Sequence, residues 1–470
     1  MQLIADLHFH SKYSRAVSPQ MVLPEIARWA RIKGIDLMTT TDFTHPLWFR
    51  QLKAGLEEVG EGVYKLKIKN KQSLSLRDEK LKIGEGPFFI FTTEISSIYT
   101  QGGKLRRIHN LVFAPNLEEA EKIGQELARR GNVMSDGRPI FGLSARDLAD
   151  IIFNVSPEAL VIPAHAWTPH FSLYGSQSGF DSLEECFGNM SKNIYAIETG
   201  LSSDPAMNWR VGELANKSII SCSDAHSGPK LGREATVFEI PDKKLLSYQA
   251  IKQAIQQSSN LAIEQSPHIA YTIEFYPEEG KYHYTGHRNC GVRHSPKETK
   301  KVGETCPVCG RHLTVGVMHR VEQLGQTTYN PPVGEAGIQH RVDEQGVRWI
   351  EHPQKNRPPY AMLVPLLEIL AESMESTVNS QKVINEYKNL TEKFGGEFNV
   401  LLKTEVTEIA KIAGPRAAEG IKKVRSGDIV VEPGYDGVFG KVLIWPSFAK
   451  ASEGKPFGVS DSDKEQMALF

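Results

Sequence analysis

Two histidines near the start of the chain have the spacing of a metal-binding pair. The sequence opens MQLIADLHFH, in which Leu3, Ile4 and Ala5 form the short apolar run that is typical of a buried strand. Because side chains alternate along a strand, His8 and His10 would point to one face. Imidazole is the commonest metal ligand in proteins, although two ordinary loop residues would also explain a single motif of this kind.

An apolar run beside a candidate ligand recurs through the first half of the chain. Phe88–Phe91 leads to Glu94, His109 opens the run Leu111–Phe113, Val161–Ala164 ends at His165, Ile35–Met38 leads to Asp42, and Ser218–Ser221 precedes Asp224 and His226. Helical stretches such as 23–33 and 117–130 lie between these runs. This alternation predicts an α/β barrel with its site at the C-terminal ends of the strands. Imidazole and carboxylate ligands without thiolates suit Zn, Mn or Fe, and a shared carboxylate suits a pair of metals.

This ordered set of ligands resembles the PHP family (polymerase and histidinol phosphatase). Members of that family are distorted (β/α)7 barrels that act as metal-dependent phosphoesterases, which implies two or three catalytic divalent metals, Zn, Mg or Mn. The resemblance implies a first metal held by His8, His10, Glu94 and Asp224, a second held by Glu94, His109 and His165, and a third site that includes His226. Glu94 would bridge the first two metals, and Asp224 and His226 are the candidates for completing the site or handling protons.

The chain departs from the family pattern at two positions. The usual Thr-Asp-His reads Thr41-Asp42-Phe43, and the acidic residue usual after the first motif is replaced near Arg15. His45 is a candidate replacement for the missing imidazole. Two catalytic metals are therefore expected, and three metals are the alternative.

The composition is that of an ordinary globular protein. The chain has 470 residues, of which 40% are hydrophobic and 24% charged, enough for two or three domains. No apolar run is long enough to span a bilayer and no signal peptide is recognisable, which predicts a cytoplasmic protein without a membrane partner. Five cysteines do not indicate a disulfide framework, and Cys186 and Cys222 are expected to be buried thiols. The net charge of −1 neither supports nor excludes nucleic acid, because clustering of charge is what matters.

A basic insertion interrupts the predicted barrel. The alternation of strands and helices places the barrel at residues 1–265 and the insertion at about 50–87. Its charged residues are mostly basic: Lys65, Lys67, Lys69, Lys71, Arg77, Lys80 and Lys82, against Asp78 and Glu79. A solvated hairpin would explain such a run, and so would a surface that holds a phosphate backbone beside a phosphoesterase site.

An aromatic loop follows the candidate ligand His165. Residues 167–179 contain Trp167, His170, Phe171 and Tyr174 among glycine, serine and proline. Aromatic side chains in a loop beside a site can stack on a nucleic-acid base, and they can equally form a small satellite core. The sequence leaves both alternatives open.

Cysteines after residue 265 indicate a structural metal. The turns at residues 287–291 and 306–310 each place two ligands three residues apart before a glycine. This spacing predicts a zinc ribbon within a lobe at residues 266–325 that lacks its own core, with one structural zinc held by His287, Cys290, Cys306 and Cys309. His294 is a competing fourth ligand. Clustered basic residues predict a DNA-facing surface here: Arg288, Arg293, Lys297, Lys300, Lys301, Arg311 and Arg320.

The remainder is predicted as a mainly helical lobe at residues 326–446 and a flexible tail at 447–470. Residues 409–421 contain a Gly-Pro turn between two helical stretches and resemble a helix-hairpin-helix, which presents backbone N–H groups to phosphate, although Gly-Pro is also simply a good turn. Strand-like runs follow at 428–431 and 437–445. The tail ends in QMALF, and Gln466, Leu469 and Phe470 resemble the peptide by which bacterial proteins dock on the sliding clamp; a frayed tail is the alternative.

The ordered combination of these parts resembles endonuclease Q, of the bacterial type, over nearly the full chain. The parts are the barrel with its basic insertion, the zinc ribbon, and a helical lobe that bears the run Pro433 to Gly437. The resemblance implies nicking of double-stranded DNA on the 5′ side of deaminated bases (hypoxanthine and uracil, with xanthine as a further candidate) and at abasic sites. Two alternatives are a small-molecule phosphatase of the histidinol-phosphate type and a non-catalytic, clamp-tethered DNA-binding protein.

Overall fold

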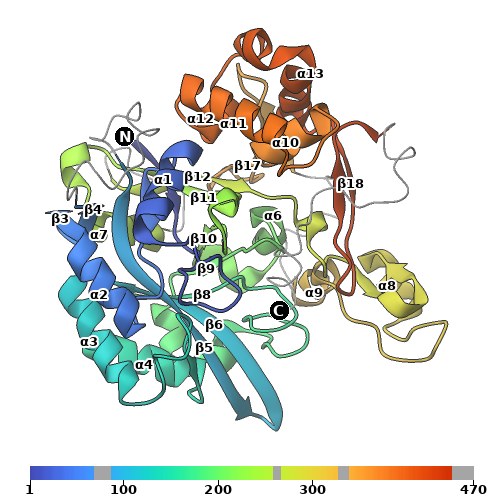
Figure 1. The fold of residues 1–470 in the computed structure, drawn as a ribbon. Coiled ribbons are helices and arrows are strands. Elements are labelled where there is room, and N and C mark those ends of the chain that lie inside the picture. The colour runs from blue at the N-terminus through green and yellow to red at the C-terminus, as the bar shows by residue number, and fades with distance from the viewer. Residues whose placement is uncertain (68–85, 258–265, 326–337, 447–470) are drawn as a thin grey trace.

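The computed structural model describes residues 1–67, 86–257, 266–325 and 338–446. Residues 68–85, which carry five of the seven basic residues of the insertion, and the QMALF peptide lie outside the described residues, so the predictions made for them stay predictions. Figure 1 shows the N-terminal half in blue to green, the segment with the clustered cysteines in yellow to one side, and a group of helices in orange above them.

A mixed sheet of thirteen strands runs through the described residues. Its strand order is β15-β16-β17-β12-β11-β1-β2-β5-β4-β3; off this path, β6 and β7 pair with β5, and β8 pairs with β6. The strands are β1 (Gln2–Asp6), β2 (Leu37–Thr39), β3 (Leu56–Gly60), β4 (Val63–Leu66), β5 (Phe88–Gln101), β6 (Lys104–Ala114), β7 (Ile140–Phe141), β8 (Leu160–Pro163), β11 (Ala235–Glu239), β12 (His268–Glu274), β15 (Gln339–Val342), β16 (Arg348–Glu351) and β17 (Tyr360–Met362). Two-stranded sheets are formed by β9 (Ala196–Glu198) with β10 (Ser218–Ile220), β13 (Thr285–His287) with β14 (Val292–His294), and β18 (Val430–Glu432) with β19 (Lys441–Leu443).

The predicted alternation of strand and helix is present where the first ligands lie. β1, β2 and β5 are parallel neighbours, and the helix expected at 23–33 is α1 (Leu23–Lys33), which connects β1 to β2. A proline in its first turn and Gly34 in the left-handed conformation at its C-cap define its ends. The other helices in this half are α2 (Pro46–Gly55), α3 (Leu117–Ala128), α4 (Ala145–Val155), α5 (Leu183–Phe187), α6 (Pro205–Trp209) and α7 (Tyr248–Gln256). These pairings establish a mixed α/β fold, while closure into a (β/α)7 barrel stays a prediction.

One strand differs from the expectation in a way that affects the site. The apolar run at 88–91 was expected to end as a strand at Glu94, but β5 continues for 14 residues and pairs antiparallel with β6. The end of the apolar run did not mark the end of the strand, because the polar residues that follow, Thr92 to Ser97 apart from Ile95, are buried as well. Glu94 therefore lies in the middle of a strand, and His109 lies in the middle of its partner.

The predicted boundary at residue 265 does not separate two sheets. β12 pairs antiparallel with β11, and β17, β16 and β15 extend the same sheet beyond it. The cysteine-bearing segment between β12 and β15 carries α8 (Pro296–Val302) and α9 (Val317–Leu324). Short 3-10 helices occur as η1 (Gly188–Asn193), η2 (Gly212–Asn216), η3 (Gly228–Lys230), η4 (Lys243–Leu245), η5 (Pro277–Glu279) and η6 (Arg288–Cys290).

The C-terminal part is helical from Leu366, but residues 339–362, which were predicted to belong to the helical lobe at 326–446, form β15, β16 and β17 of the main sheet. Its helices are α10 (Leu366–Ser373), α11 (Gln381–Phe394), α12 (Glu397–Leu402) and α13 (Val406–Ser426). α13 is two helices joined at Gly414, whose φ of 82° is non-helical, so the break expected at the Gly-Pro turn is confirmed. β18 overlaps the strand-like run that was predicted at 428–431, and β19 lies within the run that was predicted at 437–445. No helix in the described residues is long and apolar enough to cross a membrane.

A buried ion pair fastens the C-terminal helices to α1. Lys33 Nζ lies 2.7 Å from Glu397 Oε2, and the two side chains are 1% and 5% exposed. The same carboxylate accepts hydrogen bonds from the Tyr387 hydroxyl and from the backbone N–H of Leu366, so all of its partners come from different elements. Isolated charges inside a protein are strongly unfavourable, which makes this pair a point where removing one partner is costly.

We expect Glu397→Ala to lower the free energy of unfolding by about 3 to 5 kcal/mol, because it leaves the Lys33 ammonium buried without a counter-charge. Urea denaturation followed by circular dichroism measures this. Glu392→Ala, at an exposed position of α11, is the matched control. Equal losses in the two variants would contradict the assigned role of the pair.

Candidate metal centre

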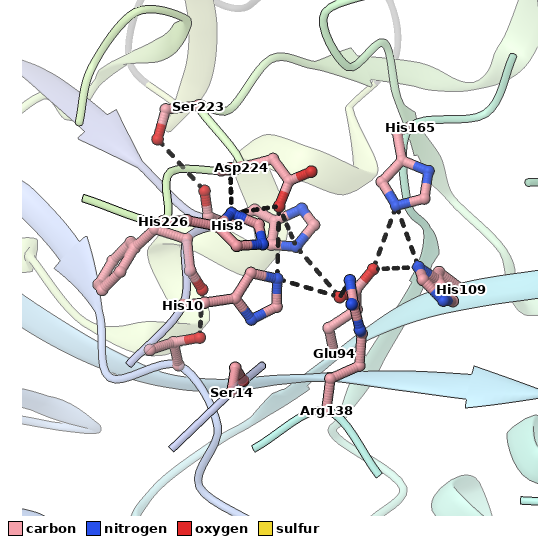
Figure 2. A network of polar contacts seen from close by, with 12 residues as sticks. His8, His10, Ser14, Glu94, His109, Arg138, His165, Ser223, Asp224 and His226 are labelled. Carbon is pink, nitrogen blue, oxygen red and sulfur yellow. Dashed lines mark hydrogen bonds and ion pairs between the residues drawn. The ribbon is translucent and has the colours of Figure 1, made fainter. Parts of the chain in front are cut away.

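The structure brings all seven predicted catalytic ligands into one cluster (Figure 2). His8 and His10 follow β1, Glu94 and His109 lie on β5 and β6, His165 follows β8, and Asp224 and His226 follow β10. Three overlapping groups of ligand atoms lie within 4.8 Å of one another: His8, His10 and Glu94; His10, Asp224 and His226; and Glu94, His109 and His165. Residues that are far apart in the chain thus share one potential cation site.

Glu94 lies between two sets of imidazoles. Its Oε1 is 2.7 Å from His109 Nδ1 and 3.1 Å from His165 Nε2. Its Oε2 is 3.2 Å from His10 Nε2 and 3.7 Å from His8 Nε2. Figure 2 shows the carboxylate with one pair of histidines on each side. This is the position that a bridging carboxylate between two metals requires.

Asp224 closes the first set of ligands. Its Oδ1 is 3.3 Å from His10 Nε2 and 3.6 Å from His8 Nε2. These three atoms are buried, and none has a hydrogen-bond partner among the described residues. Buried polar atoms without partners are unfavourable, and a cation among them would satisfy all three at once. The residues present therefore fit a divalent metal.

The charge balance of the cluster favours a cation. Burial alone would raise the pKa of Glu94, but His109, Arg138 and His8 hold it well below its usual range, so the carboxylate is an anion. Burial lowers the pKa of His109 to about 3, and that of His226 to about 3, which leaves neutral imidazoles with a lone pair to donate. Burial opposes a proton on His10, yet Asp224, Asp42 and Glu94 raise its pKa to about 10. Carboxylates that attract a proton so strongly would also attract a metal ion.

Two buried carboxylates orient the histidines of the first set. His8 Nδ1 lies 3.0 and 3.1 Å from the two oxygens of Glu198, and His10 Nδ1 lies 3.2 Å from Asp42 Oδ1. A carboxylate only accepts, so both rings carry their proton on Nδ1 and turn Nε2 toward the cluster. Glu198 also accepts from the backbone N–H of His165 at 2.7 Å, so it touches ligands on both sides of Glu94.

The sequence reasoning missed these supporting residues. Glu198 ends the short strand β9, and an apolar run from Ile194 to Ile197 that stops at an acid was the available signal. Asp42 was noted only as part of an altered family motif. Arg138, whose Nη1 donates to Glu94 Oε2 at 3.1 Å, stands in a loop with no signal in the sequence pattern.

Strained backbone marks the same positions. Asp42, His165 and Asp224 have φ angles of 45°, 31° and 44°, in the left-handed region that residues with a Cβ seldom occupy. Such conformations persist where the surrounding structure enforces them, and they concentrate at functional sites. Here they aim side chains into the cluster.

His45 does not join the candidate ligands. Its ring is stacked on Tyr13, with centroids 4.4 Å apart, and its Nε2 lies 3.2 Å from the Met134 carbonyl oxygen. Arg15 is exposed and pairs with Asp136. The hypothesis that His45 replaces the missing family imidazole is therefore not supported by the geometry, because its ring is engaged elsewhere.

A glycine packs directly against the Asp42 carboxylate. A Cβ at Gly137 would clash with Asp42 Oδ2 and with Ser14 Oγ, which donates to that oxygen at 2.8 Å. We expect Gly137→Ala to displace Asp42, to release the ring of His10, and to weaken metal binding by about 10- to 100-fold, as is usual when a residue that orients a ligand is lost. Isothermal titration with Mn²⁺ measures the change. Gly142→Ala, where a Cβ meets nothing within 4 Å, should bind as the wild type does; equal affinities in both variants would show that Asp42 has no such role.

The aromatic loop after His165 divides into a buried and a more open part. Trp167 and Tyr174 are buried, pack with ring centroids 4.7 Å apart, and bond to Asn208 and Glu213. Both side chains belong to the main hydrophobic core rather than to a small satellite core, so packing and not base contact accounts for them. His170 and Phe171 are half-buried, and the Phe171 ring lies 4.7 Å from that of His109, so base contact by these two stays a prediction.

The second candidate metal site has four ligands close together in space. His287, Cys290, Cys306 and Cys309 place their ligand atoms within 4.8 Å of one another. This geometry favours His287 over His294 as the fourth ligand. A hydrogen bond from the backbone N–H of Arg311 lowers the pKa of Cys309 to about 6, which favours the thiolate that binds metal. The set suits a structural zinc.

The surrounding lobe has little core of its own, as predicted. Its separate apolar cluster consists of Val292, Cys306 and Leu313. Its other support comes from the run at 433–437: Asp436 accepts from the backbone N–H of Arg288 at 2.7 Å and from the Thr314 hydroxyl at 2.6 Å. One of the basic residues predicted to face DNA, Arg320, instead turns inward and bonds to the aromatic loop.

Comparisons with known proteins agree with this arrangement. A family model described as the MJ0043 C-terminal domain matches residues 365–428, the segment of α10 to α13. The uncharacterised protein MJ0043 of Methanocaldococcus jannaschii is 32% identical over 286 residues, which are 60% of this chain and 32% of that protein. The chain thus spans about a third of the length of this relative.

Two solved structures match nearly the whole chain. One is the lesion-specific endonuclease PfuEndoQ from Pyrococcus furiosus, at 26% identity and a TM-score of 0.75, covering 97% of this chain and 100% of that one. The other is endonuclease Q in complex with a 27-mer duplex substrate that has an abasic lesion at the active site, at 27% identity, a TM-score of 0.75 and the same coverage. The resemblance to endonuclease Q that the sequence indicated is therefore confirmed over nearly the full chain, while the bacterial type stays a prediction.

Proposed function

We propose that this protein is a metal-dependent DNA repair endonuclease that hydrolyses the phosphodiester bond on the 5′ side of a damaged nucleotide. The substrates would be hypoxanthine, uracil and xanthine in double-stranded DNA, together with abasic sites. The observation that carries the proposal is the match, over 97% of the chain, to endonuclease Q bound to duplex DNA with an abasic lesion at its active site. The ligand cluster supplies the chemistry that such a reaction needs.

The metals would supply Lewis-acid stabilisation of the phosphate charge when bound. His8, His10, Glu94 and Asp224 would hold one ion, and Glu94, His109 and His165 the other, with Zn, Mg or Mn as the candidates. The cluster that links His226 to His10 and Asp224 would serve a third ion or a proton transfer. Because these ligands lie on separate strands and loops, the fold fixes their distances before DNA arrives.

Residues around the cluster have separate tasks in this proposal. The His226 Nδ1–H donates to the Asp224 carbonyl oxygen at 3.0 Å, so its Nε2 is the atom that can take up or release a proton. The Arg138 side chain lies beside Glu94 and is 11% exposed. From this position its guanidinium would bind the phosphate and stabilise the negative charge that develops on it during hydrolysis. Asp42 and Glu198 keep the histidines in the ligating tautomer.

The lesion would be read outside the duplex. Chemistry beside a base within the stack is blocked sterically, so the damaged nucleotide would be extruded toward the site, and a mispaired base costs less to unstack. His170 and Phe171, next to His109, are the candidates for contact with it. The zinc lobe and the helical lobe would grip the duplex on either side.

The finer assignments are part of the same proposal. They are the distorted (β/α)7 PHP barrel at 1–265, the zinc lobe at 266–325 with one structural zinc, and the helical lobe at 326–446. Docking on a bacterial sliding clamp through Gln466, Leu469 and Phe470, and a cytoplasmic location, rest on the sequence alone.

Incubation of end-labelled duplexes with Mg²⁺ or Mn²⁺ tests the function. The duplexes carry inosine, uracil, xanthine, an abasic site or no lesion, and the cut position is mapped on a sequencing gel. We expect cleavage 5′ to each lesion and none in undamaged DNA. Hydrolysis of a chromogenic phosphate ester without nicking would favour the small-molecule phosphatase, and inactivity on both would favour the non-catalytic alternative.

A further inference from the structure

One arginine of the zinc lobe contacts the loop that carries a candidate metal ligand. The loop at residues 166–181, here called the His165 loop, follows His165, which lies two residues beyond the end of β8, and it has no helix or strand of its own. Its inner side lies against the metal cluster and its outer side against α9 of the zinc lobe. No role for this contact follows from the proposed reaction itself.

The inner side of the His165 loop positions both histidines of the second metal site. Thr168 Oγ1 lies 3.3 Å from His165 Nδ1 and donates to the His170 carbonyl oxygen at 2.8 Å, so it fixes the ring that presents Nε2 to Glu94. The backbone N–H of His109 donates to the Phe171 carbonyl oxygen at 3.0 Å. Phe171 itself has a φ of 61°, a strained conformation that only its surroundings can maintain.

The outer side of the loop is held by Arg320. Its Nε donates to the Tyr174 carbonyl oxygen at 3.0 Å, and its Nη2 donates to the Phe180 carbonyl oxygen at 3.1 Å and also to Asp181. The Arg320 side chain is 13% exposed. A planar guanidinium has several N–H donors that point in different directions and can reach these separate acceptors at once, whereas a lysine ammonium cannot reproduce this arrangement. The neighbouring contact, Ser176 Oγ donating to the Val315 carbonyl oxygen at 3.2 Å, is the weaker tie.

The helix that carries Arg320 is joined to the strand of a candidate zinc ligand. β13 ends at His287, and its Gly286 exchanges two backbone hydrogen bonds with Thr314, at 2.9 and 3.0 Å. The backbone N–H of Gly316, at the N-cap of α9, donates to Thr285 Oγ1 at 3.1 Å. Val317 and Val321 of α9 are buried in the main core, so the helix is a rigid platform. The path from zinc ligand to Arg320 is therefore short and made of ordered backbone.

We propose that Arg320 is a positioning residue that locks the His165 loop onto the zinc lobe and so fixes His165 and His109 at the second metal site. The zinc lobe then has a task besides DNA binding, since it supports the catalytic cluster from outside. The part of this inference that concerns turnover rests on the proposed endonuclease activity. The part that concerns the loop does not.

Hydrogen exchange of the full-length, metal-loaded protein tests the loop directly. In Arg320→Met we expect amides in the His165 loop to exchange at least ~10-fold faster. The exchange rate is proportional to the fraction of molecules in which the loop is open, and loss of the Arg320 contacts raises that fraction. Arg320→Lys should give an intermediate rate. Gln323→Met, on the same helix but bonded to Glu304 at 3.0 Å instead of to the loop, is the matched control and should exchange as the wild type does.

Single-turnover cleavage of lesion-bearing DNA at saturating enzyme supplies the second readout. Arg320→Met should reduce the cleavage rate by about 10- to 100-fold, the usual effect of losing support for a ligand, while the affinity for DNA changes much less. Unchanged loop exchange in Arg320→Met overturns the proposal whatever the activity. A looser loop with an unchanged cleavage rate also overturns it. If the wild type cuts no DNA but the loop is looser in Arg320→Met, the proposed function is wrong and the positioning role of Arg320 is retained.

Discussion

Glu94→Gln is expected to lower the single-turnover rate of DNA cleavage by at least ~10³-fold, equivalent to about 4 kcal/mol of transition-state stabilisation. The change keeps the size and shape of the side chain but removes the negative charge that faces His10 on one side and His109 on the other. A neutral amide bridges two cations poorly, so both metals should bind more weakly. The measurements are the cleavage rate of a lesion-bearing duplex and the metal content of the dialysed protein.

Two controls keep this result interpretable. Glu57→Gln removes one carboxylate from an exposed position of β3 and should cleave at the wild-type rate. The zinc of the ribbon should be retained in Glu94→Gln, because its ligands are separate residues. A variant that loses the metals of the Glu94 cluster but still cuts at the wild-type rate would refute the assignment of Glu94.

Cys306→Ser is expected to unfold the zinc lobe locally. Cys306 is a candidate zinc ligand and also one of the few buried residues in the lobe's own apolar cluster. In small zinc domains the metal contributes about 10 to 16 kcal/mol to folding, far more than such a small core can supply. The variant should therefore lose one zinc, become sensitive to protease within 285–315, and bind duplex DNA more weakly, while metal binding at the cluster around Glu94 is retained.

Cys186→Ala is the matched control for this variant. Cys186 is a buried free thiol in the N-terminal half, remote in sequence from the ligand set, and its loss should leave the zinc content unchanged. If Cys306→Ser bound and cut DNA normally, the zinc lobe would have neither the folding role nor the DNA-binding role assigned to it.

The convergence of the candidate ligands could be predicted from the sequence because each of them stands beside a recognisable apolar run. His8, His10, His165 and Asp224 follow short buried strands, so their convergence could be expected from parallel strands that end at one edge. The zinc ligands were recognisable for a different reason, since the spacing of ligand pairs and glycines within a turn is fixed by local geometry. In both cases the signal lies within a few residues of the ligand.

The sequence failed where a residue acts through tertiary contacts. Glu94 was placed at a strand end because buried polar residues on β5 look like exposed ones in a sequence. Arg320 was assigned to a DNA-facing surface because the sequence does not show which carbonyl groups a basic side chain contacts in the fold. Trp167 was left between base contact and packing, since only its burial and its bond to Asn208 decide between them.

The central claim is that the scattered imidazoles and acids form one metal-binding centre, and anomalous diffraction from crystals of the protein soaked in Mn²⁺ tests it most directly. We predict one peak among His8, His10, Glu94 and Asp224, a second among Glu94, His109 and His165, and a separate zinc signal at His287, Cys290, Cys306 and Cys309. An ordered structure with the zinc signal alone, and no ion beside Glu94, would contradict the account.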